Sequence, residues 1–260
     1  MTATTERVAA GARQRLWSLP ALLAAVPGRF ELPVLLLIGV LAIGLWGFAE
    51  LAEEVIEGDT RQMDETLLLM LRAADDPAEP LGPGWLEETG RDFTALGGVG
   101  VLVFITAAAV FYLLMLGRAR AALFVLVAIA SGMALSTLMK MGFDRPRPDL
   151  VPHGAVVYTA SFPSAHSMMS AVTYLTLGAL LARVQPLRRL KVFVLSVAVS
   201  VALLVGLSRI YLGVHWPTDV LAGWTAGAVW ASLCWLGLLW VQRRGALRPG
   251  GGAASQRTER

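Results

Sequence analysis

The sequence predicts an all-α, polytopic membrane protein built as a bundle of six transmembrane helices. Of the 260 residues, 56% are hydrophobic and only 16% are charged. The mean hydropathy is +0.62, which is too apolar for an ordinary soluble domain. The charged residues also leave six long uncharged stretches between them. A net charge of +3 does not favour nucleic-acid binding, and the single cysteine, Cys234, excludes an intramolecular disulfide.

The six predicted spans follow directly from the stretches that lack Asp, Glu, Lys and Arg. In chain order they are residues 32–49 (18 residues), 93–117 (25), 121–139 (19), 167–182 (16), 192–208 (17) and 220–242 (23). A helix needs roughly 20 residues to cross the hydrocarbon layer. The fourth and fifth spans are therefore slightly short, which suits spans whose ends carry polar site residues, although tilted or buried helices would also explain it.

Both ends of the chain lie outside this predicted bundle. Residues 1–30 form a basic arm before the first apolar run. That arm is about thirty residues long and no cleavage-like sequence ends the run, so we expect a retained first span rather than a signal peptide. The six spans occupy residues 31–243, and residues 244–260 form a glycine-rich polar tail that is expected to be disordered.

The basic residues predict the orientation of the spans. Segments on one side of the membrane, namely the arm, the turns after the second and fourth spans and the tail, carry 15 of the 22 Lys and Arg residues. By the positive-inside rule, those segments and both termini are cytoplasmic. We therefore expect a multi-pass protein of the plasma (inner) membrane.

The outer segment 51–92 carries twelve acidic and three basic residues. Within it, Asp64–Arg72 is predicted as a short amphipathic helix with acids at its start and an arginine at its end, as the helix dipole prefers. A structural cap on the bundle is the favoured interpretation of this helix, and a substrate-guiding role is the alternative. Gly223 and Gly227 in the sixth span, and Gly97, Gly98 and Gly100 near the second, predict close helix packing.

Three polar groups interrupt the apolar sequence between residues 140 and 219. The first contains Lys140 and Arg147, the second contains Ser164 and His166, and the third contains Arg209, His215 and Asp219. Ionisable groups at the ends of spans are costly and commonly functional. The predicted topology places all three groups on the extracytoplasmic side, so we expect them to form one site.

Three of these residues, Lys140, Arg147 and Arg209, are cations suited to a phosphoryl group. Guanidinium groups match phosphate oxygens in pairs, and lysine adds a point charge. Ser164 and the backbone N–H groups beside it, near Ala165 at the start of the fourth span, can donate further hydrogen bonds. We expect neither a metal nor another cofactor, since the nearby acids do not form a convincing Mg²⁺ cluster.

The histidines complete a hydrolytic mechanism. Asp219 follows His215 by four residues, a spacing that lets the carboxylate hold Nδ1–H and leaves Nε2 free as a nucleophile. His166 then serves as the acid toward the leaving oxygen and as the base toward water. Taken singly, these groups have plainer explanations: headgroup contact for the first, a helix cap for Ser164 and snorkelling for Arg209. Their occurrence on one side favours a common site.

This arrangement resembles the three-part motif of the type 2 phosphatidic acid phosphatase superfamily. The similar positions are Lys140 with Arg147-Pro148, then Pro163-Ser164-Ala165-His166, and finally Ser208-Arg209 with His215 and Asp219. The resemblance implies metal-independent hydrolysis, with His215, Asp219 and His166 catalytic and Lys140, Arg147, Ser164, Ala165 and Arg209 binding phosphate. Ala165 replaces a usual glycine, which restricts positive φ. Arg145 is not a motif position and is interpreted as a neighbouring surface charge.

The resemblance predicts a membrane lipid phosphatase or diphosphatase. Polyprenyl (undecaprenyl) diphosphate is the favoured substrate, and phosphatidate and phosphatidylglycerophosphate are alternatives. A vanadium haloperoxidase is a second enzymatic interpretation, against which the six spans argue. A lipid scramblase or transporter is the non-enzymatic one, for which loss of His166 or His215 would be typical, and both are present.

Overall fold

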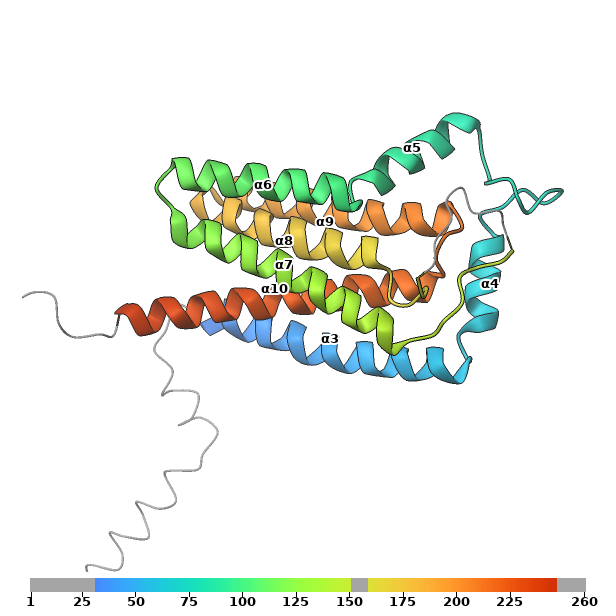
Figure 1. Cartoon of the computed structure of the whole chain (residues 1–260), viewed down its shortest axis with the longest axis horizontal. Coiled ribbons are helices and arrows are strands. Elements are labelled where there is room, and N and C mark those ends of the chain that lie inside the picture. The colour runs from blue at the N-terminus through green and yellow to red at the C-terminus, as the bar shows by residue number, and fades with distance from the viewer. Residues whose placement is uncertain (1–30, 151–158, 247–260) are drawn as a thin grey trace, which may run out of the picture. The chain divides into compact units, whose positions relative to one another are not determined.

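The computed structural model describes residues 31–150 and 159–246, and the regular elements in them are all helices (Figure 1). Labelled as in Figure 1, these helices are α3 (Glu31–Glu57), α4 (Arg61–Leu69), α5 (Gly84–Ala95), α6 (Val99–Met115), α7 (Ala119–Gly142), α8 (Ala165–Val184), α9 (Arg188–Tyr211) and α10 (Pro217–Ala246). The all-α prediction is confirmed. The predicted arm 1–30 and most of the predicted tail lie outside the described residues.

Five of these helices are long and apolar enough to cross a membrane: α3, α7, α8, α9 and α10. Helices α5 and α6, bent by 49° at the break between them, together make a sixth candidate. The six predicted spans are therefore matched, but the short one is α6, with 17 residues. Helices α8 and α9 have 20 and 24 residues, because both continue through charged residues at their ends.

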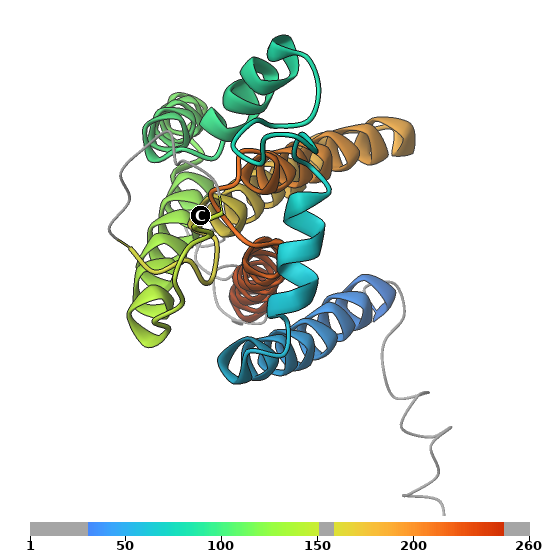
Figure 2. The ribbon, with the colours of Figure 1, turned by 90° about the vertical axis from the view of Figure 1, so that its right-hand side faces the viewer.

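The chain divides into two compact units, residues 1–39 and 40–260, and α3 begins in the first and continues into the second. Within the second unit, α8 is the central helix and packs most extensively against α9 and α10. More than half of its most apolar stretch is buried. Leu102, Val125, Ile129, Met169 and Val172 form a buried cluster that joins α6, α7 and α8. The two views in Figures 1 and 2 show α4 lying across one end of this bundle.

Small residues bring α8 and α10 into close contact. A Cβ atom on Gly223 would lie 2.6 Å from the Ser164 carbonyl oxygen, and one on Gly227 would lie 2.5 Å from that of Met168. The predicted role of these glycines in packing is confirmed. Gly97 is similar, since its Cβ would lie 2.4 Å from Val205, whereas Gly100 has no such neighbour within 4 Å. The contact at Gly223 sets the start of α8 directly against α10.

The short outer helix is displaced from its prediction by three residues at each end. It spans Arg61–Leu69 rather than Asp64–Arg72, and it buries Asp64 and Leu68. Arg72 lies beyond its end and instead donates a hydrogen bond to the carbonyl oxygen of Tyr211, 2.8 Å away at the end of α9. Asp64 accepts the backbone N–H of Thr218 at 3.0 Å, in the first turn of α10. Helix α4 is thus a structural cap, as the favoured interpretation held.

Candidate active site

The three polar groups predicted to meet do lie at one end of the bundle. Lys140 is in the last turn of α7, His166 in the first turn of α8, and Arg209 in the last turn of α9. His166 is close enough to interact electrostatically with Arg209, His215, Arg147 and Lys140. The start of α8 is also joined directly to α10, because the backbone N–H of Ser164 donates to the Asp219 carbonyl at 2.9 Å. All three groups therefore lie close together at this end of the bundle.

The turn after α9 explains the spacing between Arg209 and His215. Gly213 has φ of 70°, a left-handed conformation that costs glycine little. Its N–H bonds to the Ile210 carbonyl at 2.9 Å, and the Val214 N–H bonds to the Arg209 carbonyl at 3.2 Å. This pair of bonds is the Schellman motif that ends many helices. It reverses the chain so that His215 returns to the side of Arg209.

His215 is held in the tautomer that a nucleophile needs. Its side chain is fully enclosed, and its Nδ1 lies 3.3 Å from Asp219 Oδ2. Arg147 Nη1 lies 3.1 Å from Nε2. Because a guanidinium can only donate, Nε2 must be the unprotonated nitrogen and Nδ1 must carry the proton. Burial lowers the pKa of His215 to about 3, against the opposing effect of Asp219, so the ring is neutral at pH 7.

The Asp219 carboxylate is surrounded by donors that fix its position. Oδ2 accepts from the Trp216 backbone N–H at 3.0 Å and from the Ser161 hydroxyl, while Oδ1 accepts from Arg145 at 2.6 Å. Ser161 also lies 3.3 Å from His215 Nδ1. A carboxylate with every partner in place can orient the imidazole and stabilise it when it becomes positively charged.

Among the described residues, no acidic side chain neutralises the three predicted phosphate-binding cations. Lys140 donates to the Ala160 carbonyl at 2.7 Å, Arg147 to the Val214 carbonyl at 2.9 Å, and Arg209 to the Thr94 hydroxyl at 3.1 Å. Across residues 31–150 and 159–246, no salt bridge involves any of them. The buried Nε of Arg209 has no hydrogen-bond partner there either. These neutral contacts aim the cations without neutralising them, which suits an anionic substrate.

Ser164 and Ala165 begin α8. The Ser164 hydroxyl oxygen accepts from the Ser167 N–H at 3.4 Å and from the Ser167 hydroxyl at 3.0 Å, so it caps the helix. Ala165 is the first helical residue, where φ is negative and alanine fits without strain. The replacement of the usual glycine therefore does not disturb the backbone here. Phosphate binding by these two residues stays a prediction.

The His166 side chain is less constrained than that of His215. It is partly exposed and forms no hydrogen bond with the described part of the chain. Its backbone is fixed by the close approach of Gly97, whose Cβ would lie 3.2 Å from the His166 carbonyl oxygen. An imidazole on a fixed backbone with both nitrogens unoccupied has the freedom that an acid and base requires, and this role of His166 stays a prediction.

Comparison with known proteins identifies the family. The sequence matches the PAP2 superfamily over residues 121–243. It is also 35% identical over 150 residues to phosphatidylglycerophosphatase B of Bacillus subtilis (strain 168), a match that covers 55% of this chain and 70% of that protein. The chain belongs to the PAP2 superfamily. It is a multi-pass membrane protein and a lipid phosphatase.

Other PAP2 relatives differ in the substrate that their names give. Lipid A 1-phosphatase of Rhizobium etli is 30% identical over 175 residues, covering 58% of this chain and 70% of that protein. Undecaprenyl-diphosphatase of Sulfolobus acidocaldarius is 34% identical over 82 residues, 32% of each chain. A crystal structure of a transmembrane PAP2-type phosphatidylglycerolphosphate phosphatase from Bacillus subtilis aligns with a TM-score of 0.67 at 26% identity, covering 81% of this chain and 98% of that one.

Arg145 of this PAP2 protein is not the surface charge that the sequence predicted. Its side chain is only 12% exposed and forms two ion pairs, at 2.6 Å to Asp219 and at 2.6 Å to Asp64 on α4. It also donates to the Thr218 hydroxyl at 2.7 Å. Asp64 precedes residues 121–243, the part matched to the PAP2 superfamily. The outer segment thus contributes a buried carboxylate that reaches the His215–Asp219 pair through one guanidinium.

We expect Arg145→Lys to lower kcat by about 10²-fold with little change in KM, since a misplaced catalytic group costs about that much. A lysine keeps the charge but cannot span both carboxylates as the fork does. Asp64→Asn should have a similar effect on kcat. Steady-state kinetics on the purified variants provides the check.

The matched control is Arg61→Ala, on the same helix α4, which removes an exposed pair with Glu65. Exposed pairs contribute little, so this variant should keep wild-type kinetics. Wild-type kcat in Arg145→Lys and Asp64→Asn would show that the buried ion pairs do not position Asp219.

Proposed function

We propose that this protein hydrolyses a phosphomonoester on a membrane phospholipid, without a metal, through a phosphohistidine on His215. The observation that carries this proposal is the environment of the His215 ring. Asp219 holds its Nδ1–H at 3.3 Å, while Arg147, which donates to Nε2 at 3.1 Å, marks Nε2 as the nitrogen that carries the lone pair. Arg147 contacts that nitrogen, and Lys140 and Arg209 lie at the same end of the bundle, so the nucleophile is placed beside an anion site.

In the first step, Nε2 attacks phosphorus and the bond from phosphorus to the lipid oxygen breaks. His166 gives its proton to that oxygen, and Arg147 shifts from Nε2 to a phosphoryl oxygen. In the second step, water attacks phosphorus, the P–N bond breaks, and His166 takes a proton from the water. Inorganic phosphate leaves, and both histidines return to their starting states.

The cations supply the charge stabilisation that a metal would otherwise supply. Negative charge spreads over the equatorial oxygens in the transition state, where fixed guanidinium and ammonium groups stabilise it most. Lys140, Arg147 and Arg209 are half-buried among neutral partners and keep their charge for this purpose.

Excess EDTA should therefore leave turnover unchanged within about twofold, because the charge stabilisation comes from the side chains. Phosphate release by the purified protein, measured before and after dialysis against EDTA, provides the check. A collapse of activity that added Mg²⁺ restores would contradict metal-free hydrolysis.

Phosphatidylglycerophosphate becomes the first substrate to test, ahead of the polyprenyl diphosphate that the sequence analysis favoured. The reason is the similarity to phosphatidylglycerophosphatase B over 70% of that protein, whereas the match to undecaprenyl-diphosphatase covers 32% of its length. Polyprenyl diphosphate is the second candidate, supported by that shorter match. The cations read only the phosphate, so they suit either lipid.

An apolar cavity of about 550 Å³ beside the site suits the lipid chain. It lies between α10 and the part of α3 from Val40 onward. Leu51, which lines it, packs with Phe162 and Ala222 in a buried cluster. Phe162 is the neighbour of Ser161, which binds Asp219. A chain held in this cavity would enter next to the site.

The proposed orientation, with the termini cytoplasmic and the site at the outer leaflet of the plasma membrane, rests on the distribution of Lys and Arg.

A substrate panel on purified protein tests the proposal. We expect the highest kcat/KM for phosphatidylglycerophosphate when it is compared with polyprenyl diphosphate and phosphatidate in the same detergent. Higher kcat/KM for polyprenyl diphosphate would reverse the order of the candidates. Binding of all three lipids with no phosphate release would contradict the enzymatic proposal and favour a scramblase or transporter.

A further inference from the structure

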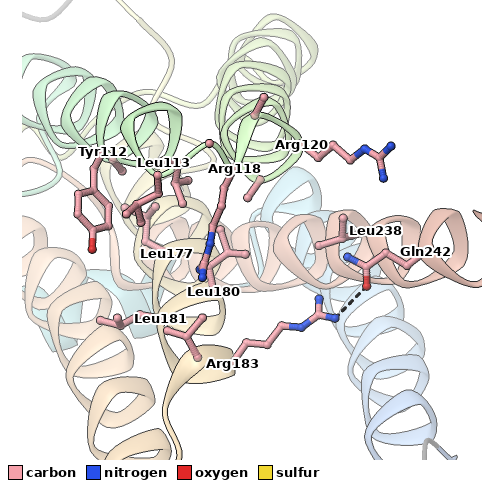
Figure 3. A pocket seen from close by; sticks show the side chains of 16 residues that line it. Tyr112, Leu113, Arg118, Arg120, Leu177, Leu180, Leu181, Arg183, Leu238 and Gln242 are labelled. Atoms are coloured by element: carbon pink, nitrogen blue, oxygen red, sulfur yellow. Dashed lines mark hydrogen bonds between the residues drawn. The ribbon is translucent and has the colours of Figure 1, made fainter.

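A second cavity lies at the end of the bundle opposite the active site. It has a volume of about 910 Å³ and is formed by the end of α6, the start of α7, the end of α8 and the last part of α10 (Figure 3). His166 is in the first turn of α8 and Arg183 in its last turn. A helical rise of about 1.5 Å per residue puts them about 25 Å apart. This cavity is therefore separate from the phosphate site.

The walls of this cavity are apolar, and its rim is cationic. Leu113, Leu177, Leu180, Leu181 and Leu238 are among the wall residues. Arg118, Arg120 and Arg183 contribute three guanidinium groups, and none of the described residues that line the cavity is acidic. A volume of this size is typical of small-molecule and cofactor pockets. A ligand that fits must combine an apolar chain with a negative headgroup.

The arginines are placed differently from one another (Figure 3). Arg118 extends across the cavity, and Arg120 points away from it. Neither side chain forms a hydrogen bond or ion pair with the described residues. Arg183 is held by Gln242 at 2.9 Å and lies over the Trp235 ring, 6.0 Å from its centroid. Arg183 is thus anchored at the rim and Arg118 keeps its donors free within the cavity, while Arg120 lines the rim with its guanidinium directed outward.

Arginines at the ends of spans are common, because they follow the positive-inside rule. These three differ from generic interfacial charges because all of them line one apolar cavity. Other basic residues of the same end, Arg188, Arg189 and Lys191 in the first turn of α9, do not line it. Basic pockets between transmembrane helices are suited to anionic lipid headgroups.

We propose that this cavity binds an anionic phospholipid from the leaflet opposite the active site. One acyl chain lies against the leucines, and the phosphate lies near Arg118 and Arg183, with Arg120 adding its charge at the rim. This site is distinct from the substrate site and does not depend on which lipid the enzyme hydrolyses. Each arginine near the headgroup should favour the anionic lipid by about fivefold.

Native mass spectrometry of the detergent-purified full chain tests this site. We expect phosphatidylglycerol to bind more tightly than phosphatidylcholine with the same acyl chains. Vanadate, present throughout, keeps the active site occupied. Combined Arg118→Gln, Arg120→Gln and Arg183→Gln should weaken phosphatidylglycerol binding by about tenfold or more. Inorganic phosphate should not compete, since it lacks the chain.

The matched control is combined Arg188→Gln, Arg189→Gln and Lys191→Gln, which removes the same charge from the same end of the bundle. This control should bind phosphatidylglycerol as the wild type does, and both triple variants should retain phosphatase activity. Leu181→Trp, which keeps the arginines but fills the exposed part of the cavity, should also lose phosphatidylglycerol. Equal loss in the two triple variants, undiminished binding in Leu181→Trp, or equal binding of phosphatidylcholine would overturn the proposal.

Discussion

Replacing His215 with alanine should lower phosphate release by about 10⁴-fold or more, the scale at which loss of a nucleophile acts. The ring supplies the nitrogen that attacks phosphorus, and no other described histidine has a carboxylate partner within 4.0 Å. The remaining cations would still bind the substrate, so KM should change little. Initial rates on purified protein, with the first-choice phospholipid substrate, give the measurement.

A folding control separates lost chemistry from lost structure in this experiment. The His215 side chain is buried and neutral. Replacing it with alanine therefore leaves a cavity beside Asp219 and removes no charge. His215→Gln keeps much of the volume and should be equally inactive. If either variant retained more than a few per cent of wild-type turnover, His215 would not be the nucleophile.

Replacing His166 with alanine should divide the reaction into its two steps. With a lipid substrate, kcat should fall by about 10²- to 10⁴-fold, the range that general acid–base catalysis contributes. With 4-nitrophenyl phosphate the leaving group needs no proton, so His215 should still be phosphorylated. Water attack on the P–N bond would then stall, because the base is absent.

Rapid mixing of His166→Ala with 4-nitrophenyl phosphate should therefore give a burst of one nitrophenol per active site, followed by slow turnover. Arg209→Gln is a suitable comparison, since it weakens phosphate binding and should reduce the rate for both substrates alike. Equal losses for the lipid and for 4-nitrophenyl phosphate in His166→Ala, with no burst, would assign His166 to binding rather than to proton transfer.

The six spans could be predicted because charged residues are excluded from hydrocarbon. The first and last residues of the helices could not be predicted, because a helix continues beyond the hydrocarbon wherever its backbone hydrogen bonds are kept. Helix α9 begins at Arg188 and ends at Tyr211, and so includes Lys191 and Arg209. The bend between α5 and α6 was also missed. It lies at residues 96–98, where Gly97 fits against Val205.

The meeting of the three polar groups at one end of the bundle could be predicted, because polar residues at the ends of apolar spans are costly and few. The buried ion pairs of Arg145 could not be predicted, because in the sequence an arginine beside prolines in a loop looks like a solvated charge. Its partner Asp64 lies 81 residues earlier in the chain. Ser161 was missed for a similar reason, since its contact with Asp219 depends on how the loop folds. The excess of acidic residues in the outer segment was the feature of the sequence that could have pointed to a role for Asp64.

The most direct measurement is the site of covalent phosphate in enzyme quenched during turnover. The His166→Ala variant, incubated with ³²P-labelled 4-nitrophenyl phosphate and quenched in alkali, should carry one phosphate on the peptide that contains His215. That phosphate should be lost in acid and kept in alkali, as expected for a phosphoramidate. No bound phosphate in an enzyme that releases nitrophenol in a burst, or a label on any other residue, would contradict the phosphohistidine mechanism.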